Sequence, residues 1–328
     1  MSQCPHFEHL LVLPHLQVQN ANAVSSPLTH GFPSMTAFLG LMWALERKTR
    51  AAGLDLSFKA VGAVCHDHQE LVTEGGFVKA FRLTRNPVGK DGGTAAIVEE
   101  GRIHLQLTLV FAVSSDRWSR EPESRHADIA RVAELLADLR VAGGSLLPPA
   151  QPERLRYRPW SLDLTGTEDD RQAAFRNARM RLLPGFALVA REDLLDARAN
   201  ELHTENRLDA WLSLSRIDWH YEPGEHGGKG GWHSDRKGGG WIVPIPVGYA
   251  ALGELHDAGT VANARDMETP FRFVESLYSV GEWLSPHRLH APQQLLWYAD
   301  TQPDAGLYRC RNDYRHAADA FEQLYDFD

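Results

Sequence analysis

The sequence has very little cysteine. Its 328 residues include only Cys4, Cys65 and Cys310, an odd number at wide spacing. Disulfide-bonded scaffolds need an even set of closely spaced cysteines. We therefore expect free thiols in a reducing compartment.

Long apolar runs are missing as well. No segment approaches the roughly 20 apolar residues of a membrane-spanning helix. Residues 1–8 lack the basic and apolar regions of a signal peptide. The composition, 43% hydrophobic and 23% charged, is typical of a globular chain. We expect a cytoplasmic protein with no membrane partner.

Recognisable catalytic motifs are also absent. The chain has no P-loop and no dinucleotide-binding glycine fingerprint, so we expect no cofactor. His66 and His68 alternate as two metal ligands on a strand would, but no nearby Cys or Glu completes the set, so we expect no metal. His30 alone is placed for general-base cleavage of RNA, without a paired acid in sequence. We predict no catalytic residues; an endoribonuclease using His30 is the alternative.

Lysine is scarce, whereas arginine is common. Six lysines stand against 28 arginines, a bias that suits phosphate binding and stacking on bases but also arises from a GC-rich genome. The net charge of −9 comes from residues 201–328, which hold 11 basic and 20 acidic side chains. We therefore place a polyanion site in residues 1–200 and a protein interface in the last third. The candidate residues of the protein interface are Trp241, Trp283, Arg288 and Trp297, although the tryptophans fit a core equally well.

Hydrophobic periodicity predicts an α+β fold for residues 1–150. Strands are expected at 9–19, 56–65, 77–84 and 103–113, and helices after the cap Ser34 and at 126–140. The order strand, helix, strands, helix, strand is that of the ferredoxin-like or RRM-like fold. Such a sheet leaves one face free, which RNA-binding proteins use.

Residues 151–328 look less regular. Short helices fit 192–203 and 207–215, and residues 223–240 are rich enough in glycine to predict a mobile loop. The strand at 241–247 contains two prolines and is expected at a sheet edge.

Polar loops supply the first candidate RNA-binding residues. The loop at 19–32 places amides, hydroxyls and an imidazole between a strand and a helix N-terminus, where phosphate oxygens and base edges are bound. An ordinary capped connection would look the same. Its candidates are Asn20, Asn22, Ser25, Ser26 and His30.

Three further segments add candidates. The tip with Arg85 and Asn86 is basic and rich in glycine, although a solvated hairpin loop would look the same. Gly143 and Gly144 would allow close backbone approach, although they also fit a plain helix C-cap. Residues 171–191 contain no Asp or Glu, so arginines of this run are candidates for phosphate binding, although the acidic residues at 168–170 could instead neutralise a surface helix. The candidate arginines are Arg176, Arg179 and Arg181.

Several longer runs resemble one known family, the second Csy proteins of type I-F CRISPR systems. The similar runs are residues 19–34, 83–87, 94–102, 140–145, 181–189, 272–275 and 281–288. The resemblance extends along nearly the whole chain, apart from residues 115–125, 150–170 and the glycine-rich loop. The resemblance implies a RAMP-superfamily protein of the Cas-five type with a protruding hairpin. It implies a ferredoxin-like RAMP domain at 1–150 and an irregular C-terminal region at 151–328.

The resemblance also implies the role and the partners. Such a protein is a non-catalytic subunit of an RNA-guided surveillance complex in antiviral defence. It binds the 5′ handle of the guide RNA, pairs with the large Csy subunit and adjoins the first Csy backbone subunit. Target DNA is bound by the assembled ribonucleoprotein.

Overall fold

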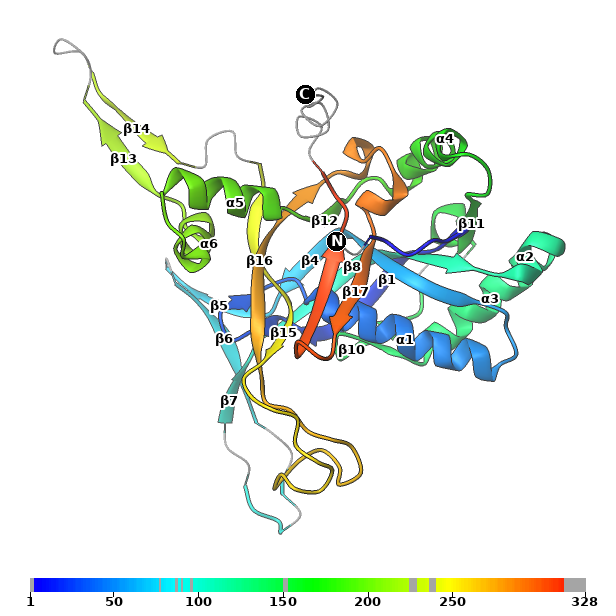
Figure 1. Cartoon of the computed structure of the whole chain (residues 1–328), viewed down its shortest axis with the longest axis horizontal. Coiled ribbons are helices and arrows are strands. Elements are labelled where there is room, and N and C mark those ends of the chain that lie inside the picture. Colours follow the sequence, from blue (N-terminus) through cyan, green and yellow to red (C-terminus); the bar gives the residue numbers. More distant parts are fainter. Residues whose placement is uncertain are drawn as a thin grey trace.

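The computed structural model describes residues 3–76, 78–85, 88–89, 91–94, 97–149, 153–223, 229–235 and 240–315. Within them, one sheet of 11 strands forms the centre of the molecule, with helices on both of its faces (Figure 1). No helix in these ranges is long and apolar enough to cross a membrane.

The first half contains the predicted elements in the predicted order. They are β1 (His9–Asn22), α1 (Met35–Ala51), β4 (Ser57–Glu70), β6 (Val78–Arg85), β8 (Arg102–Ser114), α3 (Ser124–Ala137) and β10 (Gly144–Leu147). The short strand β9 (Arg140–Val141) was not predicted. The Ser34 hydroxyl accepts a hydrogen bond from the Thr36 N–H at 3.3 Å, which confirms the predicted helix cap. Adjacent strands follow the order β4, β8, β1, β10, β9. The ferredoxin-like classification stays a prediction.

Smaller elements fill the connections of this half. They are β2 (Val24–Ser26), β3 (Thr29–His30), β5 (Val72–Gly75), β7 (Ile97–Glu100) and α2 (Asp116–Arg120). β5, β6 and β7 form a separate three-stranded sheet that projects from the body (Figure 1).

The second half is more regular than its sequence predicts. Its elements are η1 (Leu155–Tyr157), β11 (Trp160–Asp163), α4 (Glu168–Ala178), η2 (Arg179–Leu182), β12 (Phe186–Ala190), α5 (Glu192–Glu201), α6 (Arg207–Ser215), β13 (Trp219–Glu222), β14 (Gly231–Ser234), β15 (Ile242–Ala251), β16 (Val274–Leu284), η4 (Pro286–Arg288), η5 (Pro292–Gln294), β17 (Trp297–Gln302) and β18 (Leu307–Asn312). Six of these strands join the central sheet, so the sheet continues across residue 150.

Long-range pairing closes part of the sheet into a ring. β12 pairs with β16 on one side and with β4 on the other. The path then runs through β16, β15, β18 and β17 back to β4. Three pairs attach the second half to β4, namely Phe186↔Cys65, Ala187↔Val64 and Trp297↔Val61.

Side chains from the two faces of the central strands enter two different cores. Along β8, Leu109 and Phe111 pack with α1 and α3, whereas Val110 and Ala112 pack with Phe175 of α4 and with residues of the 284–298 segment. The predicted free face is therefore wrong for this part of the sheet. Because both faces are covered there, the exposed polar groups of these strands lie at strand ends and loops.

Two expectations about the second half need correction. Residues 231–234, predicted as part of a mobile loop, form β14 and pair with β13. β15 is not an edge strand along its whole length, because it pairs with both β16 and β18. However, Pro244 and Pro246 pair only with β16, and the pairing with β18 begins at Gly248, so each proline lacks a strand neighbour on one side.

Candidate functional site

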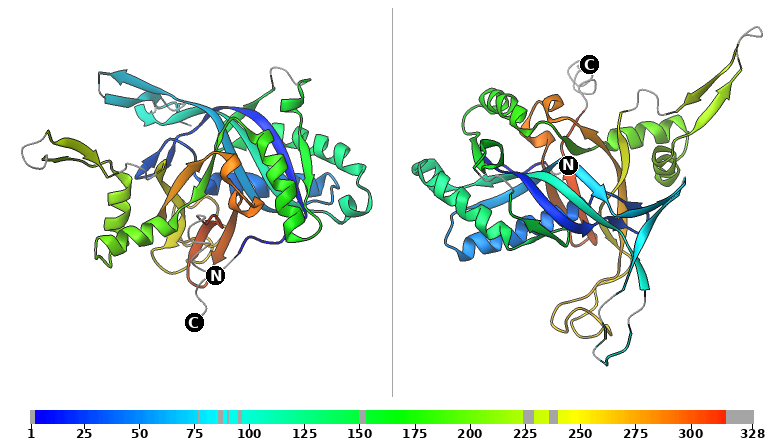
Figure 2. Two further views of the ribbon diagram at one scale, coloured as in Figure 1. Left: turned by 90° about the horizontal axis from the view of Figure 1, so that it is seen from above. Right: turned by 180° about the vertical axis from the view of Figure 1, so that it is seen from behind.

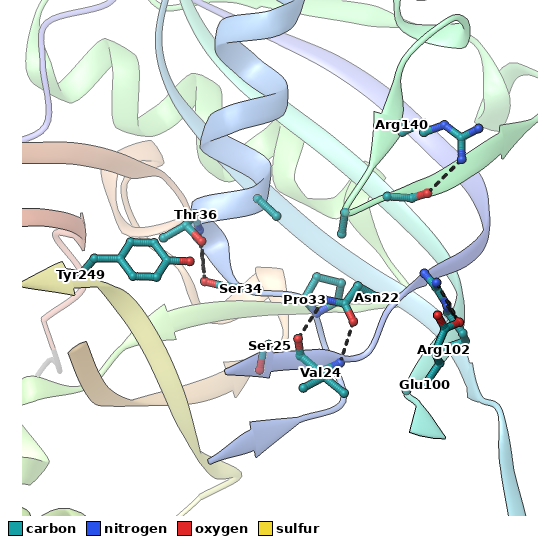
Figure 3. A pocket seen from close by; sticks show the side chains of 14 residues that line it. Asn22, Val24, Ser25, Pro33, Ser34, Thr36, Glu100, Arg102, Arg140 and Tyr249 are labelled. Atoms are coloured by element: carbon teal, nitrogen blue, oxygen red, sulfur yellow. Dashed lines mark hydrogen bonds and ion pairs between the residues drawn. The ribbon is translucent and has the colours of Figure 1, made fainter. Parts of the chain in front are cut away.

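A pocket of about 770 Å³ lies where the end of β1 meets the β9–β10 turn, the N-terminus of α1 and the start of β8 (Figure 3). A second pocket of about 410 Å³ shares Glu100, Arg102, Arg140 and Gly143 with it. We call the two together the arginine pocket. Its lining also includes Asn20, Asn22, Ser25 and Arg82.

The asparagines of the predicted loop hold the rim of this pocket in place. Asn22 donates its side-chain amide to the Val24 carbonyl at 2.8 Å and accepts the Val24 N–H at 3.1 Å. Asn20 has a positive φ of 57°, and its N–H donates to His104 Nδ1 at 3.1 Å. Asparagine tolerates this left-handed conformation better than most residues. Both asparagines are exposed, so their remaining polar groups face solvent.

The hydroxyl groups of Ser25 and Ser26 form hydrogen bonds within the loop itself. The hydroxyls of Ser25 and Ser26 lie 2.8 and 2.6 Å from Thr29 Oγ1. Ser26 is buried and stabilises the tight turn between β2 and β3, as an ordinary connection would. Ser25 also lines the arginine pocket.

Gly143 and Gly144 bring the backbone of the β9–β10 turn against β1. Gly143 has a φ of +79°, and a Cβ at Gly144 would lie 2.7 Å from the Ala21 nitrogen. The Asn22 N–H donates to the Ala142 carbonyl at 2.9 Å. The predicted close approach is thus made to β1, and it leaves Gly143 on the pocket surface.

Arginines supply the positive charge of the site. Arg102 donates two hydrogen bonds to Glu100 Oε2, at 3.1 and 2.9 Å, and Arg140 donates to the Gly143 carbonyl at 3.3 Å. Arg82 is exposed on β6, opposite Glu100 in the register. Three guanidinium groups and one carboxylate therefore give this site a net positive charge. None of the three arginines was a candidate from sequence. For Arg102 and Arg140, the neighbouring Gly101 and the Gly143–Gly144 turn were the sequence features that could have indicated a site.

His30 has an acidic partner that sequence reasoning missed. Its Nδ1 lies 2.9 Å from Glu70 Oε1, at the end of β4, and Phe81 contacts the ring edge-on at 5.4 Å. The His30 side chain is 64% exposed. His30 lines a small pocket with Ser25 and Pro246.

The predicted arginine segment lies away from the arginine pocket, because α4 and the β5–β7 sheet are at opposite sides of the molecule (Figure 1). Arg179 donates to the Leu289 carbonyl, and the Arg181 guanidinium sits 3.8 Å above the Trp160 ring. Burial lowers the pKa of both, and nearby Arg176 lowers that of Arg179 further. Arg176 on α4 and Arg181 on η2 are exposed, whereas Arg179 is half-buried. Binding of RNA here stays a prediction.

The remaining sequence candidates differ in whether the structure describes them and in how exposed their side chains are. Asn86 lies outside the described residues, and Arg85 is placed only as the last backbone position of β6. Trp297 is 1% exposed and donates to the Leu188 carbonyl at 2.8 Å, so its prediction as an interface anchor is wrong. Trp241 is 52% exposed and contacts Phe186.

The structure also places the interface candidates Trp283 and Arg288 and the candidate metal ligand His66. Trp283 packs edge-on against Phe32 at 4.9 Å, and Arg288 is exposed. His66 contacts the Pro184 carbonyl and Thr108 Oγ1 through its two ring nitrogens. Among the described residues, no group of three or more His, Cys, Asp or Glu side chains could hold a metal ion.

Comparison with known proteins decides the family. The model of the CRISPR-associated protein (Cas_Csy2) family matches residues 11–310. The CRISPR-associated protein Csy2 of Pseudomonas aeruginosa (strain UCBPP-PA14) is 46% identical over 316 residues, covering 92% of this chain and 94% of that protein. This chain belongs to the Csy2 family. The resemblance to the second Csy proteins of type I-F CRISPR systems is thereby confirmed.

The arginine pocket lies within the range that the family model matches. All the residues that line the pocket, from Gln19 to Tyr249, lie within the matched range of residues 11–310. The site therefore belongs to the part of the chain that the family shares.

Proposed function

We propose that this Csy2-family chain is a non-catalytic subunit of a type I-F surveillance complex and that its arginine pocket binds the 5′ handle of the guide RNA. The observation that carries the proposal is the convergence of Arg82, Arg102 and Arg140 on exposed polar groups of β1 and the β9–β10 turn. Guanidinium groups bind phosphate oxygens in a bidentate manner. Amide side chains beside them can read base edges of a single strand.

The position of the pocket agrees with the covered sheet. A free sheet face, as in RRM-type binding, is not present over the central strands, so RNA has to be held by strand ends and turns. The pairing with the large Csy subunit, the contact with a backbone subunit and the association with target DNA belong to the same proposal.

Salt-dependent binding of handle RNA to the purified chain tests the proposal. We expect Arg102→Ala and Arg140→Ala each to weaken binding about tenfold. Each variant is also expected to lower the salt slope by about 0.7 per lost phosphate contact. Arg131→Ala is the matched control, because Arg131 is exposed and paired with Glu134 on α3. Equal losses in all three variants, or none, would contradict the pocket as the RNA site.

The His30–Glu70 pair favours a second candidate, an endoribonuclease that processes repeat RNA. A carboxylate 2.9 Å from an imidazole nitrogen can orient the ring as a general base. Incubating the chain with repeat RNA decides between the two. Cleavage that His30→Ala and Glu70→Gln abolish would replace the non-catalytic proposal, whereas intact RNA supports it.

A further inference from the structure

The hairpin of β13 and β14 is separate from every other sheet of the described chain. The two strands pair only with each other, with Tyr221 opposite Trp232 and His220 opposite His233. In three views the hairpin projects from the body beyond α5 and α6 (Figures 1 and 2). A two-stranded sheet alone is at best marginally stable in water. We therefore expect that packing against another surface, beyond the described part of this chain, stabilises the hairpin.

One face of this hairpin is aromatic, and the other is charged. The pairing places Trp219, Tyr221 and Trp232 on one face, with exposures of 61%, 52% and 67%. The rings of Tyr221 and Trp232 meet at 5.7 Å and 63°. On the opposite face, Glu222 pairs with His220 at 2.9 Å and His233 at 3.6 Å. The charged face is thus internally paired, and the aromatic face is uncovered.

The preceding helix continues this apolar surface along the chain. α6 packs Ala210, Trp211 and Leu214 in a small core against Val280 of β16. A surface helix normally has one apolar stripe. α6 has a second one, because Leu208 and Leu212, one turn apart, are 53% and 49% exposed.

A short connection joins the two parts of this surface. Ile217, between α6 and β13, is 64% exposed. We call this set the apolar ridge; its members are Leu208, Leu212, Ile217, Trp219, Tyr221 and Trp232. Exposed apolar residues that follow one another this closely in the chain are a candidate interaction site.

The acidic residues near the apolar ridge favour a partner with basic residues around its binding surface. Among described residues 201–235, six are acidic, namely Glu201, Glu205, Asp209, Asp218, Glu222 and Asp235, and three are basic, namely Arg207, Arg216 and Lys229. An acidic border repels a polyanion such as RNA. It also disfavours a second copy of the same ridge, because two acidic borders would meet. Tryptophan and tyrosine are the residues that dominate binding energy in protein interfaces.

We propose that the apolar ridge docks another protein subunit of the same complex, one that presents an apolar groove bordered by Lys and Arg. This inference rests on the proposed function only in that the chain is a complex subunit. The ridge shares no residue with the arginine pocket, so RNA binding and subunit docking are separable.

Two matched double variants test the ridge. Trp219→Ser with Trp232→Ser removes the aromatic face, and His220→Ser with His233→Ser alters the opposite face of the same strands. The probe is the set of other Csy subunits of the same system, co-expressed without guide RNA and titrated with the purified full chain. We expect the aromatic variant to bind on the order of 100-fold more weakly and the histidine variant to bind within about threefold of wild type.

Hydrogen exchange of residues 219–222 and 231–234 supplies the second readout. We expect these amides to be protected when the protein subunits are added, and not by handle RNA alone or at high concentration of the chain alone. Protection by RNA, ridge-dependent self-association, or wild-type docking of the aromatic variant would each overturn the proposal. Handle-RNA affinity should be unchanged in both variants, and failure of the wild-type chain to join any subunit would count against the proposed function instead.

Discussion

The imidazole rings of His15 and His66 stack on each other, with centroids 4.1 Å apart and planes inclined by 31°. Thr108 Oγ1 accepts the backbone N–H of His15 at 3.1 Å and lies 2.7 Å from His66 Nε2, so it contacts both residues but only the ring of His66. His66 Nδ1 donates to the Pro184 carbonyl, so in the neutral ring Nε2 accepts the Thr108 hydroxyl. Both ring nitrogens of His66 therefore have partners when that ring is neutral, whereas His15 Nδ1 is buried without a hydrogen-bond partner among the described residues.

Acid should destabilise the fold through this pair. Burial, together with the smaller effects of neighbouring His66 and Arg156, lowers the pKa of His15 to about 4. Burial also lowers the pKa of His66. The unfolded chain then binds more protons than the folded chain between about pH 6.5 and 4, so stability falls as the pH falls. We expect the free energy of unfolding in urea to drop by about 2 kcal/mol from pH 7 to pH 5 because of His15.

A variant without the titrating group separates this cause from general acid effects. His15→Phe keeps an aromatic ring between His66 and Tyr157 but cannot be protonated. Its urea midpoint should change less between pH 7 and pH 5 than that of the wild type. An unchanged pH dependence in this variant would assign the acid sensitivity to other groups.

The carboxylate of Glu100 should limit RNA affinity. It accepts both hydrogen bonds of Arg102 and so offsets one positive charge in the arginine pocket. Glu100→Gln leaves the shape nearly unchanged and adds one net positive charge. We expect handle RNA to bind several-fold more tightly and with a steeper salt slope. Weaker binding would show instead that Glu100 positions Arg102.

The glycine at the base of the β9–β10 turn should tolerate no side chain. A Cβ at Gly144 would meet the Ala21 nitrogen and Val18 Cγ1, both at 2.7 Å. We expect Gly144→Ala to lower the free energy of unfolding by about 1 to 3 kcal/mol and to weaken handle binding. Gly40 is exposed in α1 with no atom within 4 Å of its added Cβ. Gly40→Ala should therefore stabilise the chain by about 1 kcal/mol, and a loss in both variants would exclude the steric explanation.

Neighbouring arginines on α4 and η2 should behave differently. Arg179→Ala leaves the Leu289 carbonyl without its donor, so we expect a loss of about 1 to 2 kcal/mol in urea unfolding. Arg176 is exposed, and Arg176→Ala should change stability by less than about 0.5 kcal/mol. If the segment binds RNA as predicted, Arg176→Ala weakens handle binding roughly threefold at unchanged stability. Unchanged affinity would remove this segment from the RNA site.

Local patterns predicted the first half well. The alternation at 103–113 corresponds to β8 at Arg102–Ser114, and the stripe after Ser34 corresponds to α1. These signals depend only on neighbours within a few residues. The attachment of β12 and β17 to β4 joins residues more than 100 positions apart, and no short pattern records such a pairing.

The candidate site was predicted in part for the same reason. Asn22 and Gly143 were found because turn chemistry is local. Arg102 and Arg140 were missed as ligands because they converge only when β8 and β10 pair with opposite sides of β1. Trp297 illustrates the converse error, since an aromatic residue in an acidic segment fits an interface or a core until its burial is known.

The ring that closes on β4 also sets an order of events during synthesis. β4 ends at residue 70, but its outer partners come from β12 at 186–190 and β17 at 297–302. A nascent chain emerges from its N-terminus, so the outer edge of β4 exposes unpaired backbone groups until those strands arrive. Shielding of that edge, by a chaperone or by slow collapse of the first half, has to last until nearly the whole chain has left the ribosome.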